Sequence, residues 1–152
     1  MADTLPHHTP QALAEATAQT MFARDAATRS LGMEIIAMGP GMAQLTMRVR
    51  PDMLNGHQTC HGGFIFALAD SAFAFACNSH NRNTVASGCS IDYLAPGREA
   101  DLLTAHAIEQ SRSGRLGVYD VTVRNQDGVR IALFRGKSYQ IAGEVIAIAP
   151  PQ

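Results

Sequence analysis

The chain has 152 residues, of which 46% are hydrophobic and 16% charged, and its formal net charge is −1. This length suits one domain, and the apolar fraction is ample for a core, so a disordered chain is excluded. The near-neutral charge argues against nucleic acid as a partner, since nucleic-acid-binding domains carry a basic excess. Soluble domains carry about 25% charged residues. The shortage of charge therefore indicates that some surface is buried against another subunit.

The cysteines and the termini point to a reduced compartment. Cys60, Cys77 and Cys89 cannot all pair within one chain, and no CxxC spacing is present. The N-terminus lacks a basic segment followed by an apolar stretch, so we expect no signal peptide. The longest apolar segment, residues 64–77, is too short to span a bilayer and contains Asp70. We expect a cytoplasmic protein that has no membrane partner.

The first half of the chain predicts two helices and a hairpin. Residues 1–10 form a flexible tail in this interpretation, and Thr9-Pro10 provides a cap and first-turn pair for a helix over residues 11–29. Short apolar runs on either side of Gly39-Pro40-Gly41 predict a hairpin, which is followed by a loop over residues 51–60. Apolar side chains on every face of residues 64–78 predict a second helix that is buried all round.

The second half predicts four strands separated by turns. An Asp127-Gly128 pair in the last of these turns is a strong hairpin signal. The predicted strands cover residues 85–94, 101–110, 115–124 and 129–141. Because the strands do not alternate with helices, we expect an α+β fold in which a curved antiparallel sheet wraps around a long central helix. The domain should cover residues 11–142, with a tail over 143–152.

A glycine pair and a lone carboxylate mark the predicted central helix. Gly62 and Gly63 follow His61 at its start, where a ligand can approach the backbone closely and free N–H groups favour a developing oxyanion. Asp70 is the only charged residue between His61 and Arg82, and a carboxylate among apolar residues is costly unless it has a partner or a catalytic task. A structural interpretation stays open, in which the glycines only allow tight packing and Asp70 is a satisfied carboxylate.

The spacing of these two features predicts a second chain. Eight residues of helix place Asp70 roughly 12 Å along the axis from Gly62. One Asp side chain cannot reach a carbonyl group held at its own Gly62. If both residues act on one carbonyl, the site must be shared between two subunits.

The motif resembles that of a known family. The spacing Asn55–x5–His61-Gly62-Gly63, followed by Asp70 in an apolar helix, is similar to that of the hotdog-fold acyl-CoA thioesterases, most closely the phenylacetate-pathway (PaaI) type. The resemblance covers roughly residues 31–141. The further matching stretches are Leu68-Ala69-Asp70-Ser71-Ala72-Phe73-Ala74, Ala76-Cys77-Asn78-Ser79, Pro96-Gly97, Gly117-Val118-Tyr119-Asp120 and residues 132–138.

The resemblance implies roles for four residues. The Gly62 N–H would polarise the thioester carbonyl, and Asp70 of the partner chain would act as general base or nucleophile. Asn55 would orient the water or Asp70, and His61 would support the loop or contact the thioester. It also implies dimers that are often paired into tetramers. Some relatives have a hydroxyl residue where this chain has Ala86 beside Ser87, which leaves Ser87 as the candidate.

The substrate implied is phenylacetyl-CoA or a ring-hydroxylated form of it, hydrolysed to free acid and CoA. Gly63 would lie against the substrate. The CoA phosphates need basic residues, and either Arg135 with Lys137 or Arg112 with Arg115 would serve, although solvated surface charge explains each equally well. We expect no cofactor, since coenzyme A is part of the substrate and product.

Other interpretations stay open. A hotdog hydratase or dehydratase would need an acid–base pair, and a non-catalytic acyl-CoA-binding module would bind without turnover. His57, Cys60 and His61 are close in sequence but lack a fourth ligand, so we expect no metal. Cys60 beside His61 resembles a nucleophile–base pair only by adjacency. No GxSxG motif or P-loop occurs.

Overall fold

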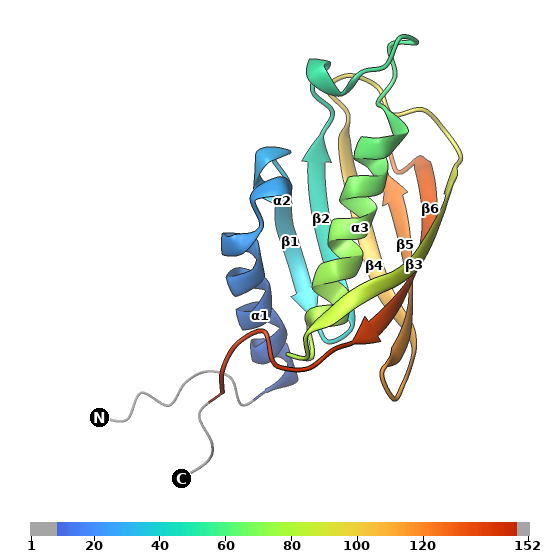
Figure 1. The fold of residues 1–152 in the computed structure, drawn as a ribbon. Helices are drawn as coiled ribbons and strands as arrows, with labels where there is room; N and C mark the ends of the chain where they lie inside the picture. Colours follow the sequence, from blue (N-terminus) through green and yellow to red (C-terminus); the bar gives the residue numbers. More distant parts are fainter. Residues whose placement is uncertain (1–8, 149–152) are drawn as a thin grey trace.

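A six-stranded antiparallel sheet curves around one long helix (Figure 1). The computed structural model describes residues 9–148. The helices are α1 Pro10–Arg24, α2 Ala26–Ser30 and α3 Gly62–Asn78, with a 3-10 turn at Pro51–Met53. The strands are β1 Glu34–Gly39, β2 Met42–Arg48, β3 Thr84–Tyr93, β4 Leu102–Ser113, β5 Leu116–Arg124 and β6 Arg130–Gln140.

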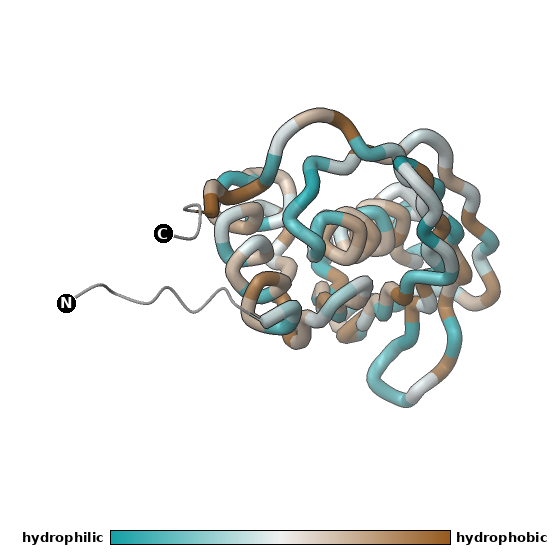
Figure 2. Tube along the Cα trace, turned by 90° about the horizontal axis from the view of Figure 1, so that it is seen from below, coloured by the Kyte–Doolittle hydropathy of each residue, from teal (hydrophilic) through white to brown (hydrophobic). Residues whose placement is uncertain are grey.

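The strand order of the sheet is β1-β2-β4-β5-β6-β3, and every neighbouring pair is antiparallel. Seen from below, α3 lies end-on in the middle of the molecule with the rest of the chain around it (Figure 2). The predicted α+β architecture is therefore confirmed. The connection from β3 to β4 carries the chain from one edge of the sheet to its interior, so β3 pairs only with β6.

The predicted N-terminal helix is divided in two. Thr9 caps α1 as expected, since its side chain accepts a hydrogen bond from Ala12 N at 3.1 Å. Asp25 then leaves the helical conformation, with φ −95° and ψ 87°. Its carboxylate accepts from Thr28 N at 2.9 Å and so caps a new helix, α2. An uninterrupted helix over residues 11–29 is thus wrong, because a favourable N-cap residue lies inside it.

The prediction that α3 is buried all round is also wrong for the single chain. Gly63 is exposed, and Ala67, Asp70 and Ala74 are only half-buried. These residues are three or four positions apart, so they form one stripe along the helix. The opposite side packs against β2, β4 and β5. The sheet therefore covers one side of α3 and leaves the stripe that carries Asp70 open.

The packing of α3 on the sheet depends on one aromatic ring. Phe73 is fully buried and contacts Tyr119 and Phe134, with ring centroids 5.6 and 5.9 Å apart. Its ring lies directly over Gly136 of β6, where a Cβ would come 2.7 Å from the ring carbons. Glycine is required there because the helix lies so close to the strand.

The last described residues run back along the end of α3. Ile146 N donates to Asn81 Oδ1 at 2.9 Å, and Asn81 Nδ2 donates to Ile146 O at 3.0 Å. The predicted tail 143–152 therefore begins with hydrogen-bonded residues, while residues 149–152 and most of the predicted tail 1–10 lie outside the described residues. No helix in residues 9–148 is long and apolar enough to cross a membrane.

Candidate active site

The start of α3 presents one unused backbone donor. His61 is the N-cap, and its Nδ1 accepts a hydrogen bond from Gly63 N at 3.2 Å. Phe64 N donates to His61 O at 3.0 Å. The N–H of Gly62, the first residue of α3, has no acceptor within residues 9–148. A free N–H at a helix N-terminus suits an oxyanion, as the sequence predicted.

A tight loop holds this helix start in place. Asn55 Oδ1 accepts from His57 N at 2.9 Å and from both Thr59 N and Thr59 Oγ1 at 3.2 Å. Gln58 adopts a φ of 63° at the loop tip. An antiparallel bridge between Leu54 and Cys60 closes the loop. The Asn55 oxygen therefore shapes the loop, and its Nδ2 donor has no acceptor in the described part of the chain.

Three further hydrogen bonds fix the start of α3 to the segments around it. Cys60 N donates to Gly97 O at 2.7 Å, and His61 N donates to Met53 O at 2.8 Å. Tyr93, the last residue of β3, donates its hydroxyl to Gly62 O at 2.8 Å. Tyr93 is a residue that sequence reasoning missed, since only the path of the folded chain brings the end of β3 against the start of α3.

A pocket of about 400 Å³ opens beside Gly62. Its lining combines the helix start with the end of β3 and the turn that follows. The lining residues include Thr59, Cys60, Ile65, Tyr93 and Pro96. Gly62, whose N–H is unused, is itself one of the lining residues, so the donor lies close to a hollow lined by both polar and apolar groups.

Asp70 lies on the open stripe of α3 and is half-buried. No residue within 9–148 makes a hydrogen bond or ion pair with its side chain. Burial, and then the negative charge of Asp25, raise the pKa of Asp70 above its ordinary value. A half-buried carboxylate of raised pKa that lacks a partner fits a general base better than a structural role.

The helix α3 is continuous from Gly62 to Asn78. The eight-residue separation therefore corresponds to roughly 12 Å along one rigid axis. Within one chain, the structure does not bring the Gly62 N–H and the Asp70 carboxylate together.

The two predicted phosphate-binding residues on β6 differ in whether their charge already has an anionic partner. Arg135 and Lys137 are both exposed and share a face of the strand, as predicted. Arg135 donates two hydrogen bonds to Asp120, at 2.7 and 2.9 Å, so its guanidinium already has an anionic partner. Lys137 makes no side-chain contact of this kind with residues 9–148, and its carbonyl oxygen accepts from Ser87 Oγ at 3.2 Å. Lys137 is the more available cation of the two.

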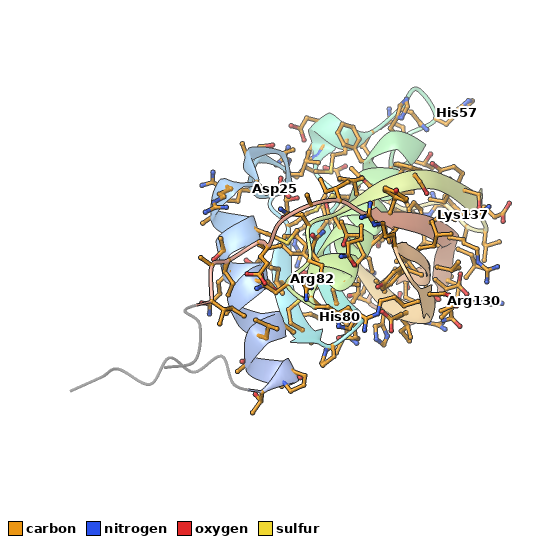
Figure 3. All side chains as sticks on the ribbon, turned by 60° about the horizontal axis from the view of Figure 1, so that its bottom comes forward. Asp25, His57, His80, Arg82, Arg130 and Lys137 are labelled. Carbon is orange, nitrogen blue, oxygen red and sulfur yellow. The ribbon has the colours of Figure 1, made fainter. Side chains whose placement is uncertain are left out.

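Arg112 and Arg115 lie beside the β4–β5 turn, at the end of α3 opposite Gly62 (Figure 1). Arg112 approaches Glu109 at 3.8 Å and lines a pocket with His80 and Arg82, just beyond the last turn of α3. Figure 3 shows His80 and Arg82 close together, far from His57 at the loop tip. In one chain, these arginines are thus remote from the helix start.

The competing cysteine site is not supported. Burial, followed by the charge of Asp101, raises the pKa of the Cys60 thiol to about 11. A thiol of that pKa is scarcely ionised near neutral pH, so it is a poor nucleophile. All three cysteines are free. In residues 9–148 no three His, Cys, Asp or Glu side chains come together in a way that could hold a metal ion.

Comparisons with known proteins show the family to which the chain belongs. Residues 57–132 match the family described as Thioesterase superfamily. Acyl-coenzyme A thioesterase PaaI of Escherichia coli (strain K12) is 50% identical over 128 residues, which are 84% of this chain and 91% of the relative.

Two solved structures extend the similarity. The E. coli PaaI protein from the phenylacetic acid degradation operon has a TM-score of 0.86 and 48% identity, covering 93% of this chain and 99% of that one. A Streptococcus mutans protein solved with bound acetyl CoA has a TM-score of 0.70 and 27% identity, covering 74% of this chain and 90% of that one. The chain therefore belongs to the thioesterase superfamily and has the hotdog fold. Within that superfamily it is a thioester hydrolase of the PaaI type.

Proposed function

We propose that this thioesterase hydrolyses phenylacetyl-CoA, or a ring-hydroxylated form of it, to the free acid and CoA. One observation carries the proposal. The same helix has an unused N–H at Gly62 and, on its open stripe, an Asp70 carboxylate that has no partner in residues 9–148. The acyl-CoA substrate is supported by the name of the E. coli relative and by the acetyl CoA bound to the S. mutans protein. The phenylacetyl group is supported by the operon that contains E. coli PaaI.

The chemistry follows from the two groups. The thioester carbonyl oxygen accepts from the Gly62 N–H, which stabilises negative charge as the carbonyl is attacked. Asp70 of the partner subunit removes a proton from water, whose oxygen forms the new bond to the carbonyl carbon. The C–S bond then breaks, and the proton passes to the departing CoA thiolate. Alternatively, the Asp70 carboxylate attacks the carbonyl carbon, the C–S bond breaks and CoA leaves as the thiolate, which gives an anhydride. Water then hydrolyses the anhydride, which restores the carboxylate, and the proton released goes to the thiolate.

The remaining predicted residues take supporting roles in this proposal. The free Nδ2 of Asn55 donates to the attacking water or to Asp70. His61 holds the turn in which Gly62 and Gly63 approach the substrate, since its Nδ1 caps Gly63. Ser87 and Lys137 lie on neighbouring strands and remain candidates for contacts with CoA. Arg112, Arg115 and Arg135 stay candidates for phosphate binding, with Arg135 the weakest because Asp120 neutralises it.

We propose a homodimer as the active unit, with pairing into tetramers. The edge strand β3 is exposed at all residues except Thr84 and Ile91, and it adjoins the open stripe of α3. A long unpaired edge is a template for pairing with a second chain. Pairing there would cover the α3 stripe and place two helix starts near two Asp70 side chains. The cytoplasmic location stays a prediction from the free cysteines.

The direct test is Asp70→Asn, assayed by release of free thiol from phenylacetyl-CoA. We expect kcat to fall by about 10²- to 10⁴-fold, because the amide cannot act as base or nucleophile. Asp127→Asn is the matched control, since Asp127 is exposed in the β5–β6 turn. A folded Asp70→Asn enzyme with undiminished turnover would contradict the role of Asp70.

The same assay separates the rival functions. A hydratase or dehydratase would convert an enoyl-CoA without releasing thiol, whereas a binding module would show affinity without turnover. The histidine–carboxylate pair that such a hydratase needs occurs once in residues 9–148, as His80 with Glu109 at 3.0 Å. That pair lies beyond the opposite end of α3 from Gly62, which favours hydrolysis. Oxygen-18 entering Asp70 in a single turnover would identify the anhydride route.

A further inference from the structure

Tyr93 makes the one side-chain hydrogen bond to the Gly62 residue within the described chain. Its hydroxyl donates to Gly62 O at 2.8 Å, although half of the side chain is exposed to solvent. The ring also lies against the Gly62 Cα, since a Cβ built there would come 2.9 Å from Tyr93 Cζ and 3.0 Å from the hydroxyl oxygen. A ring this close leaves room only for glycine and restricts the movement of that residue.

The position of Tyr93 on the sheet is itself well determined. Tyr93 pairs with Ala132 of β6, and the next residue, Leu94, donates its N–H to Ile131 O at 2.8 Å. These bonds fix the end of β3 to the interior of the sheet. The Tyr93 hydroxyl therefore connects a rigid strand end to the first turn of α3, where backbone groups lack the full set of helical hydrogen bonds.

We infer that Tyr93 is a positioning residue for Gly62, the residue whose N–H binds the oxyanion, and that its ring forms a wall of the substrate pocket beside Gly62. The inference rests on the proposed function, because it requires that the Gly62 N–H bind the thioester oxygen. An N–H stabilises the negative charge of the transition state only when it points at the oxyanion from hydrogen-bond distance, so movement of the N–H weakens this stabilisation. Tyr93 limits that movement through Gly62 O and through direct contact with the Cα. The same ring lines the pocket of about 400 Å³, so an acyl or pantetheine group held there contacts it.

The edge strand β3 thereby also affects catalysis. Because β3 is the strand proposed to pair with the partner subunit, the Tyr93–Gly62 bond connects the subunit interface with the residue whose N–H binds the oxyanion. The strand end and the helix start then keep one geometry in the assembled enzyme. A sequence motif could not reveal this link, since Tyr93 is 31 residues from Gly62.

The test is Tyr93→Phe in the full-length enzyme, with Tyr139→Phe as the matched control. Tyr139 is an exposed residue of β6 whose hydroxyl has no hydrogen-bond partner in residues 9–148. For Tyr93→Phe we expect kcat with phenylacetyl-CoA to fall about 3- to 10-fold, since only a supporting hydrogen bond is lost. We expect unchanged affinity for a CoA thioether that has no carbonyl group and an unchanged acid limb of the pH profile. Tyr139→Phe should match the wild type.

Three outcomes would overturn the inference. The first is a wild-type kcat in the folded Tyr93→Phe enzyme. The second is a loss of kcat that is accompanied by an equally large loss of affinity for the thioether. The third is a loss of kcat that is fully explained by partial unfolding, seen as a lower melting temperature. Tyr93→Leu should lower kcat further and raise KM, because it also removes the ring wall. Failure of the proposed function has a different signature, since wild-type enzyme would then release no thiol from any acyl-CoA.

Discussion

At the scale of single residues, the reactivity of Asp70 depends on its neighbours. Burial disfavours the ionised carboxylate, and the negative charge of Asp25 adds to that effect. Asp25 belongs to a short hydrogen-bonded chain that reaches α3, because Thr28 Oγ1 donates to Asp25 at 2.7 Å and lies 3.1 Å from Ser71 Oγ. Ser71 follows Asp70 directly. The residue that divides α1 from α2 is therefore electrostatically coupled to the proposed base.

Replacing Asp25 by Asn should shift the pH dependence of hydrolysis. A base must be ionised, so activity rises with pH through the pKa of Asp70. Removing the negative charge of Asp25 lowers that pKa, and the acid limb of the kcat profile should move to lower pH. Asn is as good an N-cap as Asp, so α2 should persist. The measurement is kcat against pH for Asp25→Asn.

Glu15→Gln provides the control for this shift. It removes one negative charge from the exposed face of α1, and the hydrogen bond with Gln11 can persist. We expect its acid limb to coincide with that of the wild type. An acid limb that stays in place in Asp25→Asn, or moves to higher pH, would refute the coupling between Asp25 and Asp70.

Residues of the site differ in how far the sequence reveals them. Gly62 and Asp70 are recognisable because a glycine pair at a helix start and a charge in an apolar helix are local patterns. Tyr93 and Asp25 are not, because their importance arises from strand order and from a helix break that place them beside residues distant in sequence. The pairing of Arg135 with Asp120 is hidden in the same way, since it needs the β5–β6 register.

At the scale of elements, α3 has two tasks that require opposite faces. One face is packed tightly enough that Phe73 lies on the backbone of β6 at Gly136. The other face carries Asp70 and is left open by the chain's own sheet. The sequence correctly predicts the helix and the strands, but uniform hydrophobicity cannot distinguish a face covered by the sheet from one left for a partner.

Gly136→Ala should destabilise the protein by about 1–3 kcal/mol. The added Cβ would lie 2.7 Å from Phe73, and overpacked cores relax only by shifting side chains or backbone. Chemical unfolding at fixed protein concentration measures the effect. Phe73→Leu in the Gly136→Ala background should cost less than the two changes summed, because the smaller side chain relieves the contact.

Gly56→Ala is the control for the Gly136 substitution. A Cβ at Gly56 meets no heavy atom within 4 Å, and its φ is not in the left-handed region. We expect a change in unfolding free energy within about 0.5 kcal/mol. Equal destabilisation by both alanines would show that the close approach of Phe73 to β6 is not what requires glycine at 136.

At the scale of the whole molecule, the low fraction of charged residues can be assigned to particular surfaces. The open stripe of α3 is made mostly of small uncharged residues, and the adjoining edge of β3 is exposed along most of its length. The outer face of the sheet also exposes Ile108, Leu116 and Leu133. These surfaces are where a second and further copies of the chain would reduce exposed apolar area. Light scattering should therefore report a dimer or tetramer at micromolar concentration, and a stable monomer would contradict this assignment.

A composite site makes a sharper prediction than oligomeric state alone, since two inactive variants should complement each other. Asp70→Asn removes the base, and Gly62→Pro removes the N–H donor. The second variant also carries Tyr93→Ala, because a Cβ at position 62 would otherwise come 2.9 Å from the Tyr93 ring. Proline is favourable at the first position of a helix, and His61, with ψ 133°, already has the extended conformation that precedes proline. We expect each variant alone to be nearly inactive in thiol release from phenylacetyl-CoA.

Co-expression of the two variants with different tags should restore activity. In a mixed dimer, one site combines the intact Gly62 of one subunit with the intact Asp70 of the other, whereas the second site lacks both groups. Random pairing makes half of the dimers mixed, so activity should return to about a quarter of wild type. Isolation through both tags should raise this to about half. If the purified mixed dimer were as inactive as its parents, Gly62 and Asp70 would not act across the interface.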